Sequence, residues 1–344
     1  MKILKQVAGI DVAQKELVVS FGRLREDLSV ELHASNVFPN TQKGHHALID
    51  WVKNTFDPGI AVQFVMEATG VYHESLAYFL VDRSCKVVVV LPNKISNYFR
   101  TLQVKTINDY TAAEAIARFG LERKLDHWQR PDPVLKKLRQ LCRERDQIVD
   151  TRTITKNQLH AEKAEAEPNA GTIARFKQHI VLLNKQVAQV KSEIEGLIKS
   201  KKELTESVKL LTTIPGVGVL TAATVLAETN GFELVRNKKQ LTSYAGLDVR
   251  EKQSGTSIKG KPTISKRGNR YLRKAMHLPA LAAIRCDSRF KSVFTRLVEK
   301  HGIKMKAAVA VQRKLLELTY TIYKTKMPYQ VDFETSIKKE KQPA

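Results

Sequence analysis

The sequence predicts a mixed α/β domain in the N-terminal part, a helical coiled-coil segment in the middle and a mostly α-helical domain after it. Three observations lead to this prediction. From residue 6 to about 130, short β-rich runs alternate with amphipathic helical stretches. From about 134 to 205 the pattern is helical and highly charged, with apolar residues three or four positions apart. From 206 to about 330 the helical pattern continues, with one helical run on each side of the turn IPGVG.

The first domain, residues 1–133, is predicted to contain a mixed sheet. The expected strands cover residues 6–13, 16–24, 30–38, 60–68 and 86–92, and the expected helices cover 41–56 and 74–83. Three early strands, a helix and then further strand and helix units follow the order of the ribonuclease-H-like arrangement.

The middle segment, residues 134–205, is predicted to form two long helices that fold back on each other. Its second half carries a heptad seam of apolar residues: Ile173, Phe176, Ile180, Leu183, Val187, Val190, Ile194 and Leu197. Pro168 and Gly171 interrupt the helical pattern between the two halves. The segment is interpreted as a spacer or an oligomerisation arm, and a purely structural role is the alternative.

The third domain, residues 206–330, begins with two helical runs around IPGVG, a helix-hairpin-helix-like segment. Gly216 and Gly218 permit a tight turn and leave backbone N–H groups at a helix start, which can hold a phosphate without reading sequence. A Pro-Gly turn that only connects two packed helices is the alternative. Residues 331–344 have the composition of a disordered tail.

The charge of the chain indicates a polyanionic partner. Lys and Arg outnumber Asp and Glu by 58 to 35, giving a formal net charge of +23 and a pI near 9.9. A basic surface without a partner is the alternative. Three scattered cysteines suggest neither disulfides nor zinc, and no stretch resembles a signal peptide or membrane span, so a soluble, intracellular protein without a membrane partner is expected.

Three carboxylates of the first domain are candidate metal ligands. Asp11 and Glu67 end apolar strands, and in open α/β sheets sites collect at the carboxyl ends of strands. Asp109 begins a later alanine-rich helix. Together they have the hard oxygen ligands that a two-metal phosphoryl-transfer site requires. Asp11 as a turn former, and three unrelated surface acids, are the alternatives.

A basic segment of the last domain is the candidate nucleic-acid contact. No acidic residue occurs from 252 to 286, and eight basic residues lie between 252 and 274: Lys252, Lys259, Lys261, Lys266, Arg267, Arg270, Arg273 and Lys274. We expect a flexible loop that enters a helix, which suits phosphate contacts. A solvated basic loop is the alternative. Ser254 lies in this segment and is either a nucleophile activated by positive surroundings or part of a turn.

Five ordered blocks then show a family resemblance. They are GIDVAQKEL, EATGVY, KTINDYTAAEAIA, LLTTIPGVG, and SYAGLDVREKQSG with SKRGNRYLRKAM. In this order, across residues 9 to 280, they resemble the DEDD transposases of bacterial insertion sequences that move by bridge-RNA-guided recombination. The resemblance implies a RuvC-like N-terminal domain, a coiled-coil middle and a C-terminal transposase domain that contains a catalytic serine.

The resemblance also assigns site residues. Asp11, Glu67 and Asp109 match the first three letters of the DEDD motif and would bind Mg²⁺, and Ser254 matches the nucleophile of the SG motif. The fourth letter falls on Ala112, by natural divergence or by deliberate replacement that traps uncut nucleic acid. Glu114 lies about 200° around an ideal helix from Ala112 and would point away. We expect weakened metal binding and cleavage with nucleic-acid affinity retained.

The partners implied by the resemblance are a guide (bridge) RNA, donor and target double-stranded DNA, and further copies of the chain in a dimer or tetramer. The implied location is the bacterial cytoplasm, at the nucleoid. Two other functions stay open. One is a RuvC-like junction-resolving or metal-dependent endonuclease in which Ser254 only contacts phosphate, and the other is a catalytically silent RNA- and DNA-binding scaffold.

Overall fold

The computed structural model divides the chain into two compact units, Met1–Arg130 (unit 1) and Pro131–Ala344 (unit 2). The structure describes residues 2–68, 70–106, 108–251, 253–254, 258–260 and 262–330, and of residues 253–254 and 258–259 only the main chain. In the part of the chain that it describes, no helix is both long enough and apolar enough to cross a membrane.

Unit 1 is built on a five-stranded mixed sheet. Its strands are β1 (Ile3–Val12), β2 (Glu16–Arg25), β3 (Val30–Pro39), β4 (Val62–Glu67) and β5 (Lys86–Val90). They lie in the order β3-β2-β1-β4-β5; β1 and β3 pair antiparallel with β2, and β4 runs parallel to β1 and β5. β1, β4 and β5 therefore end at the same edge of the sheet, where sites of such folds form.

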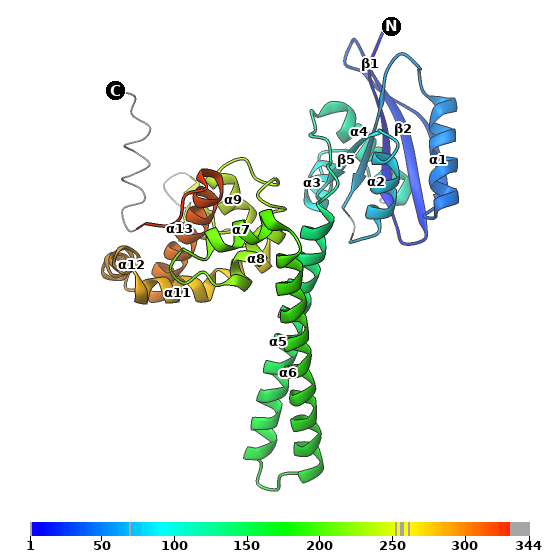
Figure 1. The fold of residues 1–344 in the computed structure, drawn as a ribbon. Coiled ribbons are helices and arrows are strands. Elements are labelled where there is room, and N and C mark those ends of the chain that lie inside the picture. The colour runs from blue at the N-terminus through cyan, green and yellow to red at the C-terminus, as the bar shows by residue number, and fades with distance from the viewer. Residues whose placement is uncertain are drawn as a thin grey trace, which may run out of the picture. The chain divides into compact units, whose positions relative to one another are not determined.

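Helices cover both faces of this sheet (Figure 1). α1 (Gln42–Thr55) and α2 (His73–Val81) share one apolar core with the strands, and α3 (Pro92–Phe99) and α4 (Asp109–Glu122) share a second core. Along β1, Ala8 and Ile10 belong to the first core and Val7 belongs to the second. This alternation follows from the period of a strand, whose successive side chains point to opposite faces.

The backbone of α4 approaches β1 very closely at Gly9. A Cβ atom built at Gly9 would lie 2.6 Å from the carbonyl oxygen of Ala113 and 2.6 Å from the Cα atom of Ala117. Further along α4, a Cβ atom at Gly120 would lie 2.8 Å from a methyl group of Val7. Later residues of α4 thus lie beside earlier residues of β1, so α4 begins near the carboxyl end of β1.

Unit 2 begins with a helical hairpin. α5 (Pro133–Ala164) and α6 (Ala170–Lys199) pack along each other (Figure 1). Asp132 caps α5, since its carboxylate accepts hydrogen bonds from the N–H groups of Val134 and Leu135 at 2.8 and 3.2 Å. On α6 the predicted seam is the buried face from residue 183 to 194 and half-buried before it. The hairpin agrees with the expected fold-back, and a coiled coil stays a prediction.

Seven further helices and the base of the hairpin share one apolar core. The helices are α7 (Lys202–Leu211), α8 (Val219–Glu228), α9 (Lys238–Tyr244), α10 (Arg270–Ala275), α11 (His277–Cys286), α12 (Ser288–His301) and α13 (Lys304–Thr325). Leu138 of α5 and Ile194 of α6 are fully buried in this core. The middle segment and the last domain, separate at residue 205 in our prediction, are therefore one compact unit.

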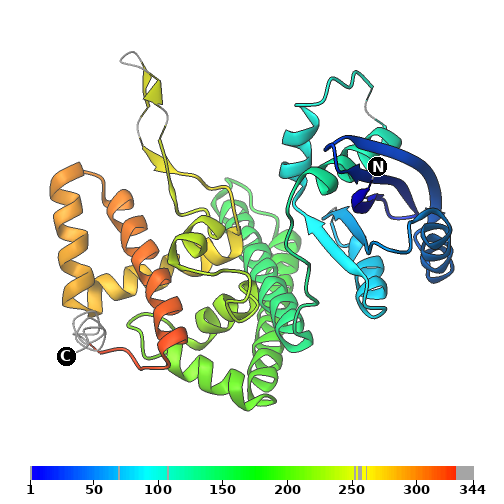
Figure 2. The same cartoon turned by 90° about the horizontal axis from the view of Figure 1, so that it is seen from above.

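The segment between α9 and α10 forms a β-ribbon that projects from the helices (Figure 2). β6 (Val249–Arg250) pairs antiparallel with β9 (Thr263–Ile264), and β7 (Gln253–Ser254) pairs antiparallel with β8 (Ile258–Lys259). A flexible loop was expected here. Most residues of this stretch are charged or polar, so the sequence lacks the apolar alternation that predicts strands.

The mixed α/β N-terminal domain and the mostly helical remainder are confirmed. Each predicted strand and helix of unit 1 is present within a few residues of its expected bounds. The sequence did not predict α3, which has eight residues and buries only Ile95 and Tyr98. The residues predicted as a tail, 331–344, lie outside the described residues.

Candidate active site

Asp11 and Glu67 are neighbours at the carboxyl edge of the sheet. Ile10 pairs with Met66 across the parallel strands β1 and β4, so Asp11 and Glu67 occupy the next position of each strand. Adjacent strands lie about 4.8 Å apart. By alternation both residues lie on the face of the sheet that α4 covers, since Val65 belongs to that core. Both are half-buried.

Asp109 enters the same region from the first turn of α4. The side chain of Asn108 accepts from the N–H of Thr111 at 2.9 Å, and the hydroxyl of Thr111 accepts from the N–H of Asn108 at 3.0 Å, which forms a capping box. This cap determines where α4 starts. Asp109 is exposed, and it lies four residues before Ala113, the residue that packs on Gly9.

The electrostatics of Asp11 show that the two aspartates interact. Burial raises the pKa of Asp11, the negative charge of Asp109 raises it further, and a backbone hydrogen bond at Val12 opposes both effects. A half-buried carboxylate beside a second carboxylate is destabilised when both are ionised. A cation between them would relieve this repulsion.

The donor chemistry of this edge fits a hard divalent cation such as Mg²⁺, because carboxylate oxygens are its preferred ligands. The set is nevertheless incomplete. Among the described residues, no three His, Cys, Asp or Glu side chains come close enough together to hold a metal ion. Ala112, half-buried and one turn after Asp109, offers a methyl group where the resemblance implies a carboxylate.

Ser254 lies in β7, beyond the β6–β9 pair, and its main chain pairs with Ile258. Its side chain lies outside what the structure describes, as does that of Lys259, and Lys252 and Lys261 are outside the described residues. Ser254 belongs to unit 2 and the three acids belong to unit 1. Their proximity stays a prediction.

At the base of the ribbon, Lys266, Arg267 and Arg270 are exposed. Two other predicted phosphate contacts have intramolecular partners that the sequence did not reveal. The ammonium group of Lys274 lies 2.9 Å from Asp146 and 2.7 Å from Asp150, both on α5. The guanidinium of Arg273 donates to the carbonyl oxygen of Ala245 at 2.7 Å.

The turn IPGVG also has a structural explanation. Gly216 has a φ of +85°, in the left-handed region that favours glycine, and a Cβ atom there would meet the carbonyl oxygen of Pro279 and lie 3.0 Å from the N of Ala283 on α11. Packing against α11 therefore requires a glycine at position 216. Gly218 precedes α8 in open space, so phosphate binding there stays a prediction.

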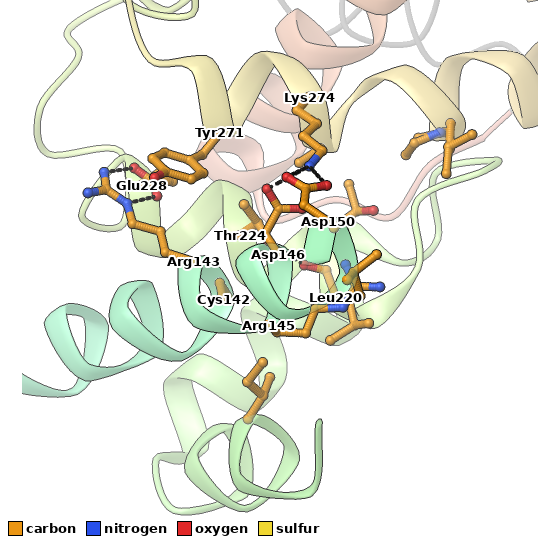
Figure 3. Close-up of a pocket in the computed structure, with 16 residues that line it drawn as sticks. Cys142, Arg143, Arg145, Asp146, Asp150, Leu220, Thr224, Glu228, Tyr271 and Lys274 are labelled. Atoms are coloured by element: carbon orange, nitrogen blue, oxygen red, sulfur yellow. Dashed lines mark hydrogen bonds and ion pairs between the residues drawn. The ribbon is translucent and has the colours of Figure 1, made fainter. Parts of the chain in front are cut away.

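A cavity of about 320 Å³ lies where α5, α8 and α10 meet (Figure 3). At one end Arg143 donates two hydrogen bonds of 2.7 Å to Glu228, which is 1% exposed, and Asn269 donates a third to Glu228 at 2.6 Å. The ring of Tyr271 lies under the Arg143 guanidinium.

No sequence pattern singles out Arg143 or Glu228. Each is a polar residue in a long helix, and only the packing of α5 on α8 brings them together. Asn269 has two roles: its side-chain NH₂ group donates to Glu228, and its side-chain oxygen caps α10 by accepting from the N–H of Leu272 at 2.9 Å. The pair therefore connects the hairpin with the helix that follows the ribbon.

Comparisons with known proteins define the class. A family model described as a transposase, of the IS110 DEDD type, matches residues 8–162, and a second model, described as the transposase IS116/IS110/IS902 family, matches residues 208–295. The two models follow each other along the chain and together cover more than two thirds of it. The protein is thus of the transposase and recombinase class.

Within that class, the chain belongs to the IS110 family of transposases. It is 28% identical over 327 residues to the pilin gene-inverting protein of Moraxella bovis, covering 94% of this chain and 98% of that protein. It is 26% identical over 281 residues to the transposase for insertion sequence element IS1111A of Coxiella burnetii, covering 73% and 74%. Membership implies DNA strand cleavage and transfer.

Among solved structures, the chain is similar to RuvC of Thermus thermophilus. The TM-score is 0.28 at 14% identity, over 36% of this chain and 99% of RuvC. A structure of that RuvC in complex with a Holliday junction substrate has a TM-score of 0.27. Scores of this size do not establish a fold. The fold of unit 1 is described here from its own strand order.

Proposed function

We propose that this chain is an RNA-guided DNA recombinase that exchanges strands of donor and target DNA through a covalent link to Ser254, with Mg²⁺ held by Asp11, Glu67 and Asp109. Family membership supports DNA cleavage and transfer. The net charge of +23 supports a protein that holds several nucleic-acid segments at once.

The observation that carries the proposal is the interaction of Asp11 with Asp109. Asp11 ends the first strand beside Glu67, and Asp109 begins the helix whose Ala113 packs on Gly9 of that strand, so that the negative charge of Asp109 raises the pKa of Asp11. Acidic residues that only decorate a surface gain nothing from mutual repulsion. A cation site explains why the fold keeps them together.

In the proposed reaction, the hydroxyl oxygen of Ser254 attacks the scissile phosphorus. A new Oγ–P bond forms, one P–O bond to deoxyribose breaks, and the leaving oxygen takes up a proton as a hydroxyl. The number of phosphoester bonds is unchanged, so the strand can be rejoined to another end without an external energy source. Bound Mg²⁺ would polarise the phosphate and stabilise its developing charge. Basic residues Lys266, Arg267 and Arg270 would bind the flanking phosphates.

The guide RNA would choose the DNA sites by base pairing, while the protein binds backbone and shape. Because the acids and Ser254 lie in different units, a dimer or tetramer in which copies combine their units is expected. The relatives named for gene inversion support recombination between two sites.

A second function is favoured by one specific observation. Ala112 stands at the fourth acidic position, and the described residues do not gather three metal-binding side chains. The chain with Ala112 would then act as a scaffold that binds RNA and DNA and cleaves DNA weakly or not at all. Its nucleic-acid affinity would be retained, since that depends on the basic surface.

The test compares the chain as written with Ala112→Asp and with Ala112→Asp carrying Ser254→Ala or Glu67→Gln. Each is incubated with Mg²⁺, DNA and the co-purified RNA, and cleaved strands and protein–DNA adducts are separated on denaturing gels. We expect an adduct only with Ala112→Asp. Cleavage without an adduct in the Ser254→Ala protein would favour the endonuclease. Strand transfer by the chain as written would eliminate the scaffold.

The guide is tested separately by sequencing the co-purified RNA. One discrete structured RNA is expected. Random cellular RNA would contradict the guided mechanism and would indicate charge-driven binding.

A further inference from the structure

Exposed apolar side chains gather around the acidic edge of unit 1. Among the described residues of this unit, eight large hydrophobic residues have strongly exposed side chains. Five of the eight belong to the segments that follow β4 and β5 and lead into α4: Val71, Tyr72, Leu91, Val104 and Tyr110. We call these five the apolar rim. Their exposed fractions run from 41% to 69%.

Residues of the apolar rim are separated by only a few residues from the strand ends and the helix start that carry the acids. Tyr72 follows β4 by five residues, and its carbonyl oxygen accepts a hydrogen bond of 3.2 Å from Asn40, whose side chain also donates to the carbonyl oxygen of Ala13 at 2.9 Å, just past the end of β1. Leu91 directly follows β5. Tyr110 follows Asp109 in the first turn of α4. The main chain of Tyr72 is thus tied to the end of β1, and Tyr110 stands next to Asp109 on a different element.

The rim has features of a ligand surface. The five residues follow the ends of neighbouring parallel strands or lead into α4, so they belong to one edge of the sheet, and exposed apolar residues that gather in one place indicate a binding site. Three exposed basic residues, Lys94, Arg100 and Lys105, lie in the stretch between Leu91 and Tyr110. Aromatic rings interleaved with cations fit a nucleotide, whose base has an apolar face and whose phosphate is an anion.

A duplex does not satisfy this surface. In a duplex the faces of the bases are stacked on one another, and only edges and phosphates are accessible. A base whose face is available has left the stack, as happens in single strands and at distorted sites. The occupant that the rim fits is therefore an unpaired nucleotide.

We propose that the apolar rim stacks on unpaired bases of the DNA next to the phosphate at the acidic edge, with Tyr72 and Tyr110 as the stacking rings. This inference rests on the proposed function, which puts DNA at that edge. It adds that the DNA there is unstacked, so the protein prefers unpaired DNA to a duplex of equal charge.

The test measures binding of the full chain, in a chelator that prevents cleavage, by fluorescence anisotropy. The probes are a single strand of about 12 nucleotides and an abasic strand of the same length, which keeps the phosphates and lacks the bases. We expect the strand with bases to bind roughly fivefold to a hundredfold more tightly. Tyr72→Ala combined with Tyr110→Ala should remove most of that difference and leave the abasic strand unaffected.

Controls separate stacking from other effects. Tyr72→Phe with Tyr110→Phe keeps the rings and should keep the difference. Leu28→Ala changes an equally apolar side chain, 72% exposed, at the β2–β3 turn and should change nothing. Thermal unfolding confirms that each variant folds, and both tyrosines are exposed enough that no cavity forms.

Three outcomes would overturn the proposal: equal binding of both strands by the unsubstituted chain, a difference that survives in the double alanine variant, or a change of molecular mass in that variant. The last would mean that a second copy of the chain covers the rim. Because the assay involves neither Mg²⁺ nor Ser254, stacking can fail while cleavage succeeds. A chain that binds no strand at all would contradict the proposed function itself.

Discussion

Replacing Gly9 with alanine should disturb the contact that positions Asp109. The added methyl would stand 2.6 Å from the carbonyl oxygen of Ala113 and from the Cα atom of Ala117, whereas ordinary contacts begin at 3.4 Å. These atoms belong to the backbone of α4 and cannot rotate away. The helix must therefore move away from β1 by about 1 Å, which takes Asp109 away from Asp11.

The expected cost follows from overpacking. Inserting a methyl into a close-packed interior costs about 1–3 kcal/mol, and the rigid neighbours here favour the upper part of that range. For a protein of 344 residues such a loss lowers the unfolding temperature by roughly 1–4 °C. Closer packing elsewhere in unit 1 cannot offset this loss of stability, because the contact of α4 with β1 at Gly9 fixes the distance between these two elements.

Thermal unfolding followed by circular dichroism would measure this. Gly120→Ala is the graded control, since its methyl would meet side-chain atoms of Val7 and Val65 at 2.8 and 2.9 Å, which can shift. Gly196→Ala on α6 is the open-space control, because nothing lies within 4 Å, and it should be neutral or stabilising. A Gly9→Ala protein as stable as the unsubstituted chain would refute the close approach on which the site geometry depends.

Three further predictions concern charge. Asp11→Asn should raise the unfolding free energy near pH 7 in a chelator. The fold raises the pKa of Asp11, so the stability of the unsubstituted chain falls as the pH rises from the ordinary carboxyl pKa through the raised one. The gain from Asp11→Asn should therefore vanish near pH 3, where Asp11 is protonated. Adding Mg²⁺ should raise the unfolding temperature of the unsubstituted chain more than that of Asp11→Asn, and equal shifts would contradict a site at Asp11. Arg143→Met should cost about 3 kcal/mol in denaturant unfolding because it leaves buried Glu228 without its main partner. The control is the pair of Arg313 and Glu317 on α13, whose carboxylate is only half-buried, and Arg313→Met should cost under about 1 kcal/mol.

Local periodicity determined the elements. The alternation of apolar residues in β1 and β2, and the three-four spacing on α6, are properties of neighbouring residues, and the structure buries the faces that they predict. α3 was missed because eight residues are too few to show a helical period. The ribbon was missed because its strands are two residues long, which is too short to show an alternating pattern.

The chemistry of single positions was also visible in the sequence. Asp11 and Glu67 end apolar runs, and the structure puts them at adjacent strand ends. The sequence alone also shows that position 112 carries no carboxylate. What the sequence could not supply is which charged residues are already paired: Lys274 has the same surroundings in sequence as Arg270, but it pairs with Asp146 and Asp150.

The sequence by itself determined the order of strands and helices, the excess of positive charge and the set of candidate acids. Only the tertiary structure decided that the charge of Asp109 acts on Asp11, that Glu228 is enclosed by Arg143 and Asn269, and that five apolar residues near the acidic edge are exposed. The physical reason is the separation along the chain between the residues that interact. Secondary structure depends on residues a few positions apart, whereas these contacts arise when packing, such as that of α4 on Gly9, brings distant segments together.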